Sequence, residues 1–137
     1  MYRVHLLDPD GHVTVHEVQT SEFETTDRGI AMYGTTIVPW HRVLRYTRDV
    51  EQPLSDLGLS TRAEVRVWVD DGSPTGETHL VRADRFDTGP WTAEFLVEVL
   101  VDVEHAVVRL RKIFVPWSRV LEYERLLRPA DVPGRVD

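Results

Sequence analysis

The nine residues "VPWHRVLRY" (Val38–Tyr46) return almost unchanged near the other end of the chain as "VPWSRVLEY" (Val115–Tyr123). The two windows differ at only two positions, where the first has His41 and Arg45 and the second has Ser118 and Glu122. Tryptophan is a rare residue, so two aligned Val-Pro-Trp triplets in a chain of 137 residues are hard to explain by chance. The repetition predicts an internal duplication.

Each window closes a longer unit. The segment "YRVHLLDPDG" (Tyr2–Gly11) precedes the first window, and "EVRVWVDDG" (Glu64–Gly72) precedes the second. Both are short runs of alternating apolar and polar residues that end in an Asp-Gly turn signal. The sequence therefore predicts four segments: a first copy at residues 1–49, a linker at 50–62, a second copy at 63–126 and a tail at 127–137. The tail is expected to be loosely ordered.

Short strands account for most of the first copy. Val4 and Leu6 alternate with polar residues, and so do Val13 and Val15 after the turn, which is typical of a hairpin with one apolar face. Three further strands are expected in "RGIAMYG", "TTIVPW" and "RVLRY", because Pro39 marks a strand end or a corner. Five short strands are typical of a small, bent barrel. The predicted fold is all-β, with two tandem five-stranded barrels.

Residues 92–111 of the second copy fit two periodicities. Valines occupy every second position over part of this segment, as in a strand, whereas Glu94, Glu98 and Asp102 recur every four residues, as on a helix. The β-branched valines favour the strand. We therefore predict an extended hairpin in the second copy that turns near Glu104, overhangs the barrel and offers a strand edge to another chain.

The order of these elements resembles the Sm-like group of small SH3-like barrels, which includes Sm, LSm and bacterial Hfq proteins. The resemblance rests on a strand, an Asp-Gly turn, three further strands and a short closing strand after the Val-Pro-Trp-His corner. In Hfq-like proteins this corner contacts RNA in the pore of a ring, so the resemblance implies that His41 faces RNA and that Arg42 follows it. The second copy departs from the pattern, with Ser118 at the matching position. The resemblance also implies a homo-oligomer joined through edge strands, for which a ring of three chains is one hypothesis.

The repeated tryptophans and arginines are the candidate ligand-binding residues. Trp40 and Trp117 could stack on bases, but a tryptophan at a repeated position more often closes the end of its own barrel, so we favour a place in the core. Arg42 and Arg119, extended by Arg45, would form a basic stripe if the two copies pack side by side. The alternative is a set of solvated positions balanced by neighbouring acids.

The composition argues against several kinds of site. Cysteine is absent, and the sequence contains no glycine-rich phosphate loop, Gly-x-Ser-x-Gly elbow or His-Glu-x-x-His motif. We therefore expect no catalytic residue, cofactor or metal. No run of about 18 apolar residues is present, so no membrane partner is expected, and a cytoplasmic location is the default expectation. A net charge of −7 disfavours RNA at long range, and DNA is not expected.

Two functions follow from these observations. The first is a non-catalytic interaction or assembly module that acts through exposed strand edges, with a homo-oligomer or another protein as the partner. The alternative is an Sm-like protein that binds single-stranded RNA through an arginine and histidine stripe. Arg42 and Arg119 discriminate between the two functions, because they must form a continuous exposed stripe for RNA and are paired with acids otherwise.

Overall fold

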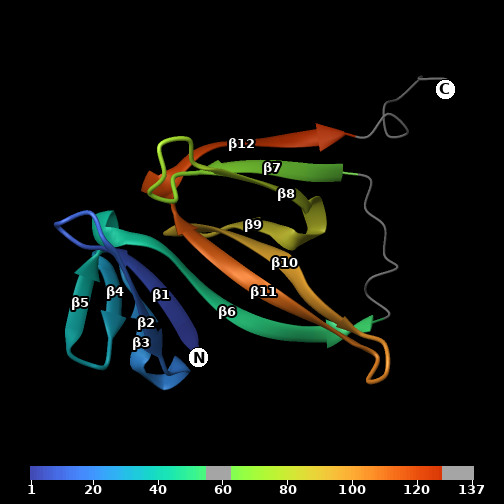
Figure 1. Cartoon of the computed structure of the whole chain (residues 1–137), viewed down its shortest axis with the longest axis horizontal. Coiled ribbons are helices and arrows are strands. Elements are labelled where there is room, and N and C mark those ends of the chain that lie inside the picture. Colours follow the sequence, from blue (N-terminus) through green and yellow to red (C-terminus); the bar gives the residue numbers. More distant parts are fainter. Residues whose placement is uncertain (55–62, 128–137) are drawn as a thin grey trace.

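The computed structural model describes residues 1–54 and 63–127, which form an all-β structure, as predicted (Figure 1). The first copy contains β1 (Tyr2–Leu7), β2 (Val13–Val18), β3 (Phe23–Thr25), β4 (Gly29–Met32), β5 (Thr36–Pro39) and β6 (Val43–Pro53), with 3-10 turns η1 (Thr20–Glu22) and η2 (Trp40–Arg42). The second copy contains β7 (Ala63–Val69), β8 (Glu77–Arg82), β9 (Phe86–Thr88), β10 (Thr92–Asp102), β11 (Val107–Pro116) and β12 (Val120–Leu127), with 3-10 turns η4 (Ala83–Arg85) and η5 (Trp117–Arg119). Within the described residues, no helix is long and apolar enough to cross a membrane.

The two copies repeat the same strand pairings. In the first copy β1 pairs antiparallel with β2 and β6, and Val4 lies opposite Tyr46. In the second copy β7 pairs in the same way with β8 and β12, and Val67 lies opposite Tyr123. The register therefore makes β6 equivalent to β12, and the equivalence extends through the 3-10 turn that precedes each of these strands.

The prediction of five strands in each copy is wrong, because each copy has a sixth strand. The additional strands β3 and β9 are three residues long and follow a 3-10 turn, so they are too short to leave an alternating pattern in the sequence. Strand β6 continues to Pro53, so the start of the predicted linker is also strand. The rest of that linker (55–62) and the tail from residue 128 lie outside the described residues.

Residues 92–111 form strands rather than a helix, as predicted. Strand β10 is 11 residues long and β11 is 10 residues long, whereas β4 and β5 have four residues each. The two long strands pair antiparallel and are joined by a turn at residues 103–106. The greater length of the second copy therefore lies in this hairpin.

The strands form three antiparallel sheets, and one of them joins the two copies (Figure 1). The six-stranded sheet has the order β2-β1-β6-β11-β10-β9, and the three-stranded sheets have the orders β12-β7-β8 and β3-β4-β5. The first and second copies meet where β6 pairs with β11. No sheet closes on itself within the described residues, so the prediction of two closed barrels is not confirmed.

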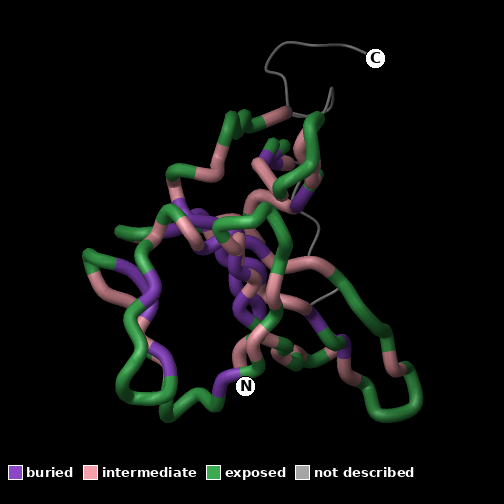
Figure 2. Tube along the Cα trace, turned by 60° about the vertical axis from the view of Figure 1, so that its left-hand side comes forward, coloured by how far each residue is buried: buried purple, intermediate pink, exposed green. Residues whose placement is uncertain are grey.

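Two hydrophobic clusters fill the interior, one for each copy, and the buried residues gather in the middle of the molecule (Figure 2). The first cluster contains Val4, Leu6, Val18, Ile30, Met32, Val38, Val43, Tyr46 and Phe114. The second contains Val65, Val67, Val69, Val81, Phe95, Ile113 and Val115. Phe114 belongs to the first cluster although it lies on β11 of the second copy. The two cores are therefore stabilised together.

Candidate interaction surface on the last strand

The two repeated tryptophans occupy equivalent, partly buried places. The indole Nε1 of Trp40 donates to the carbonyl of Thr26 at 2.8 Å, and that of Trp117 donates to the carbonyl of Gly89 at 2.9 Å. Trp40 also packs against the first hydrophobic cluster. Each indole thus ties the corner before the last strand to the turn that follows β3 or β9.

Both repeated arginines are paired with an acid of their own copy. Arg42 Nη2 lies 3.3 Å from Asp8 Oδ1, and Arg119 Nη1 lies 2.8 Å from Asp70 Oδ2. The acids follow β1 and β7, so each arginine fastens the 3-10 turn of its copy to the end of the first strand. Of the two arrangements that the sequence left open, the structure has the acid-paired one.

His41 and Arg45 lie at the contact between the copies rather than on a common stripe. The carbonyl of His41 accepts a hydrogen bond from Arg119 Nη2 at 2.9 Å, while His41 itself is exposed. Arg45 Nη1 lies 3.5 Å from Glu77 Oε2 in the second copy. Because Arg42, Arg45 and Arg119 each have an acidic partner, the candidate residues form no unbroken cationic surface.

His5 lies opposite Arg45 in the sheet, and its surroundings lower its pKa below the ordinary value of 6.5. Partial burial is the main cause, followed by the positive charges of Arg45, Arg3 and Arg111. The unfolded chain therefore takes up a proton on His5 at a higher pH than the folded chain. The stability that the neutral ring contributes is complete above about pH 6.5 and decreases as the pH falls below it.

We expect His5→Gln to reduce the loss of stability between about pH 7 and pH 5, because the variant removes the group that resists protonation. Urea unfolding of the variant and the wild-type chain at these two pH values measures the effect. His41→Gln is the matched control, since His41 is exposed and is not one of the groups that surround His5. A pH dependence that is the same in His5→Gln as in the wild type would contradict the prediction.

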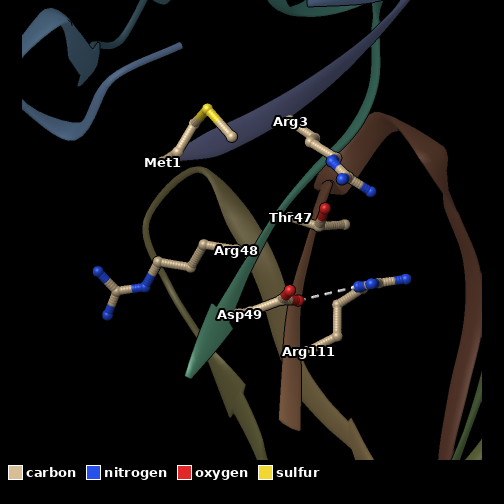
Figure 3. A pocket seen from close by; sticks show the side chains of 6 residues that line it. All are labelled: Met1, Arg3, Thr47, Arg48, Asp49 and Arg111. Carbon is tan, nitrogen blue, oxygen red and sulfur yellow. Dashed lines mark hydrogen bonds and ion pairs between the residues drawn. The ribbon is translucent and has the colours of Figure 1, made fainter. Parts of the chain in front are cut away.

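A pocket beside β6 has three arginines in its lining. Its lining consists of Met1, Arg3, Thr47, Arg48, Asp49 and Arg111. The guanidinium groups diverge, because Arg48 points to the opposite side of β6 from Arg3 and Arg111 (Figure 3). Arg111 Nε donates to Asp49 Oδ1 at 3.1 Å, and Arg48 Nη1 donates to the Tyr2 hydroxyl at 3.4 Å. The arginines do not converge on a single anion site.

Among residues 1–54 and 63–127, no group of three or more His, Asp or Glu side chains is arranged to hold a metal ion.

The contact between the copies, which we call the seam, consists of eight paired positions between β6 and β11. They run from Pro53 opposite Val107 to Tyr46 opposite Phe114. The rings of Tyr46 and Phe114 stack with their centroids 4.5 Å apart and their planes 10° apart. Leu44, the bulged residue at the start of β6, lies beside the β7–β8 loop, where a Cβ on Gly72 would be 4.0 Å from Leu44 Cδ1.

The side chains at the equivalent positions of the second copy are exposed to solvent. Leu44 and Tyr46 are 5% and 4% exposed, whereas Leu121 and Tyr123 on β12 are 51% and 50% exposed. Leu121 is the bulged residue of β12, as Leu44 is of β6. The residue types are the same in both copies, so the difference in burial comes from the neighbour that covers the first pair.

The outer edge of β12 also lacks a neighbouring strand in the part of the chain that the structure describes, because β12 is the outermost strand of its sheet. We call this edge, together with Leu121 and Tyr123, the β12 face. Tyr123 is held in place by ring contacts to Phe86 and Trp117, with centroids 5.5 and 5.9 Å away. The β12 face thus offers backbone hydrogen-bonding groups beside an oriented aromatic ring.

The predicted long hairpin is present, but among the described strands only one of its two strands, β10, keeps a free outer edge, and only over part of its length. The outer edge of β11 is occupied by β6 of the same chain, so it is not offered to another molecule. Strand β10 pairs with β9 only at Ala93–Phe95, and beyond this point β11 is its one partner among the described strands.

Comparisons with protein-family models, with curated proteins and with solved structures gave no match for this chain. The resemblance to Sm-like proteins therefore rests on the sequence features alone.

Proposed function

We propose that this protein is a non-catalytic interaction and assembly module that accepts a β-strand on the β12 face. The observation that carries the proposal is the contrast between Tyr46, which is covered, and Tyr123, which is exposed at the equivalent position. In the first copy, the covering element is a strand that pairs with β6. The β12 face presents the same edge and the same two apolar residues to an incoming strand.

Two physical arguments support strand addition at this edge. An outermost strand carries a row of backbone N–H and C=O groups that another strand can satisfy, and this is a recurrent mode of peptide recognition. Aromatic residues that become buried on binding commonly carry a large part of the interface energy. Tyr123 combines both features, because it is half-exposed and lies on the edge strand itself.

We also propose that each copy has the strand arrangement of a small Sm-like barrel. The support is the repeated strand order, the 3-10 corner before the last strand, and a hydrophobic cluster enclosed by strands of two sheets. The proposal concerns the architecture and does not extend to RNA binding.

A labelled peptide with the sequence of β11, "VVRLRKIFVP" (Val107–Pro116), tests the function. This strand occupies the equivalent edge in the first copy, so we expect saturable binding by fluorescence anisotropy. Tyr123→Glu should weaken binding at least about tenfold, because it places a charge where an apolar contact forms. Leu80→Glu is the matched control, since Leu80 is exposed on the far strand of the same sheet. Absence of saturable binding would contradict the proposal.

Single-stranded RNA remains the alternative partner, to be contacted through His41, Arg42, Arg45 and Arg119. The acid partners of these arginines and the net charge of −7 count against it. We expect a short labelled RNA to show no saturable binding, even at low salt where attraction to phosphate is least screened. Binding that weakens steeply with salt and is lost in an Arg42→Ala/Arg119→Ala double variant would favour the alternative instead.

A further inference from the structure

We infer that the strand accepted by the β12 face is β5 of a second copy of this chain, so that chains join head to tail. This inference rests on the proposed function and names its partner. The chain itself contains the template for the contact, because the seam already joins the last strand of one copy to the fifth strand of another. The last strand of the second copy, β12, and the fifth strand of the first copy, β5, have no partner of this kind among the described strands, and each is outermost in its sheet.

Ile37 on β5 is the residue that would cover Tyr123. Within the repeated windows Val38 matches Val115, so the residue before each of them, Ile37 or Phe114, also occupies an equivalent position. Phe114 is 7% exposed because it stacks on Tyr46, whereas Ile37 is 59% exposed. Ile37 on β5 and Tyr123 on β12 are thus both uncovered, and their equivalents Phe114 and Tyr46 lie opposite each other in the seam.

The other contacts of the seam also have uncovered counterparts. The β7–β8 loop lies against Leu44, and the matching β1–β2 loop (residues 8–12) is mostly exposed and available to cover Leu121 of a neighbour. Arg119 donates to the carbonyl of His41 across the seam. The matching donor is Arg42, whose side chain is 37% exposed, and the matching acceptor is the carbonyl of Ser118 in the neighbouring chain.

The second contact must form between chains rather than within one. Strands β5 and β12 belong to different sheets of the chain and do not pair with each other, although the corner after β5 contacts the corner before β12 through the Arg119–His41 hydrogen bond. The contact uses two different surfaces, and such head-to-tail contacts produce closed rings or open filaments.

Cysteine cross-linking tests the pairing directly, because the chain contains no cysteine of its own. Directly opposite residues in an antiparallel pair have Cα atoms about 4.5–5.5 Å apart, which is within disulfide reach. Mixing Ile37→Cys with Tyr123→Cys under mild oxidation should give a linked dimer of the two variants, and the double variant should give a ladder. Leu80→Cys mixed with Tyr123→Cys is the control and should give little product. Efficient linking of Tyr123→Cys to itself would overturn the inference, because it would mean that β12 pairs with β12.

A complementation experiment tests the direction of the contact without cross-linking. Sedimentation velocity at moderate salt is suitable, because chains with a net charge of −7 repel one another less when screened. We expect the wild-type chain to associate, Ile37→Glu and Tyr123→Glu each to be monomeric, and their equimolar mixture to stop at dimers. Ile37 is 59% exposed, and Tyr123 is 50% exposed but contacts the rings of Phe86 and Trp117, so circular dichroism must first establish that both variants keep the wild-type fold.

The two proposals fail in different ways. If the β11 peptide binds but the wild-type chain stays monomeric up to about 0.1 mM and the cysteine variants do not link, the β12 face serves a different protein and the inference is wrong. If the peptide does not bind either, the proposed function itself is wrong.

Discussion

Gly29→Ala is expected to destabilise the chain by about 4 kcal/mol, from overpacking and backbone strain together. An added Cβ would lie 1.9 Å from the carbonyl oxygen of Val38 and 2.9 Å from Pro39 Cα, and both of these are backbone atoms that no rotamer change can move. Gly29 also has a backbone φ of +153°, a conformation that residues with a side chain rarely adopt. Gly29 lies opposite Pro39 in the β4–β5 pair, so the substitution must displace one strand from the other.

Chemical denaturation measures this loss, and Gly11→Ala is the matched control. Gly11 also has a positive φ, of +87°, but an added Cβ there would meet no atom within 4 Å. The control should therefore cost only about 1 kcal/mol, from backbone conformation alone. Equal losses in the two variants would mean that the close approach of β5 to Gly29 does not matter for stability.

Phe114→Ala is expected to cost about 3–5 kcal/mol and to destabilise both copies together. Phe114 is carried by β11 of the second copy, but its ring lies in the core of the first and stacks on Tyr46. Its removal leaves a cavity at the seam, where the two cores adjoin. We expect tryptophan fluorescence and circular dichroism both to record a single unfolding transition with a lower midpoint.

Ile37→Ala provides the control for Phe114→Ala, because it truncates an apolar residue at the equivalent position of the first copy. Ile37 is mostly exposed in the single chain, so the substitution should change the stability of dilute protein by less than about 0.5 kcal/mol. Two separate transitions in Phe114→Ala, with the second copy unaffected, would contradict the view that the seam couples the cores.

The repeated windows predicted the duplication, and the alternation of apolar and polar residues predicted the all-β class and the long hairpin, because these depend on local patterns. The seam could not be predicted in the same way, since the alternation in β6 and β11 is the same whichever strand lies beside them. The one signal is charge complementarity across the seam, where Arg111 lies 3.1 Å from Asp49 and Arg109 lies 3.8 Å from Glu51. Such pairs can be recognised only after the two strands are known to be neighbours.

The candidate surface could not be predicted from the sequence, for a related reason. Leu44 and Tyr46 match Leu121 and Tyr123 letter for letter, so the sequence assigns the same role to both pairs. Their different burial is decided by a neighbouring copy, which is a property of the tertiary structure. The repeated arginines illustrate the same limit, because their acid partners Asp8 and Asp70 are remote in sequence.

The unequal hairpins of the two copies have a consequence for how an assembly of these chains would come apart. Strand β11 offers eight paired positions to β6, but β5 has only four residues to offer to β12. The seam also joins parts of one covalent chain, so its effective concentration is fixed, whereas the other contact depends on how much protein is present. On dilution, junctions between chains would therefore open first, and each released unit would be a whole chain with its seam intact.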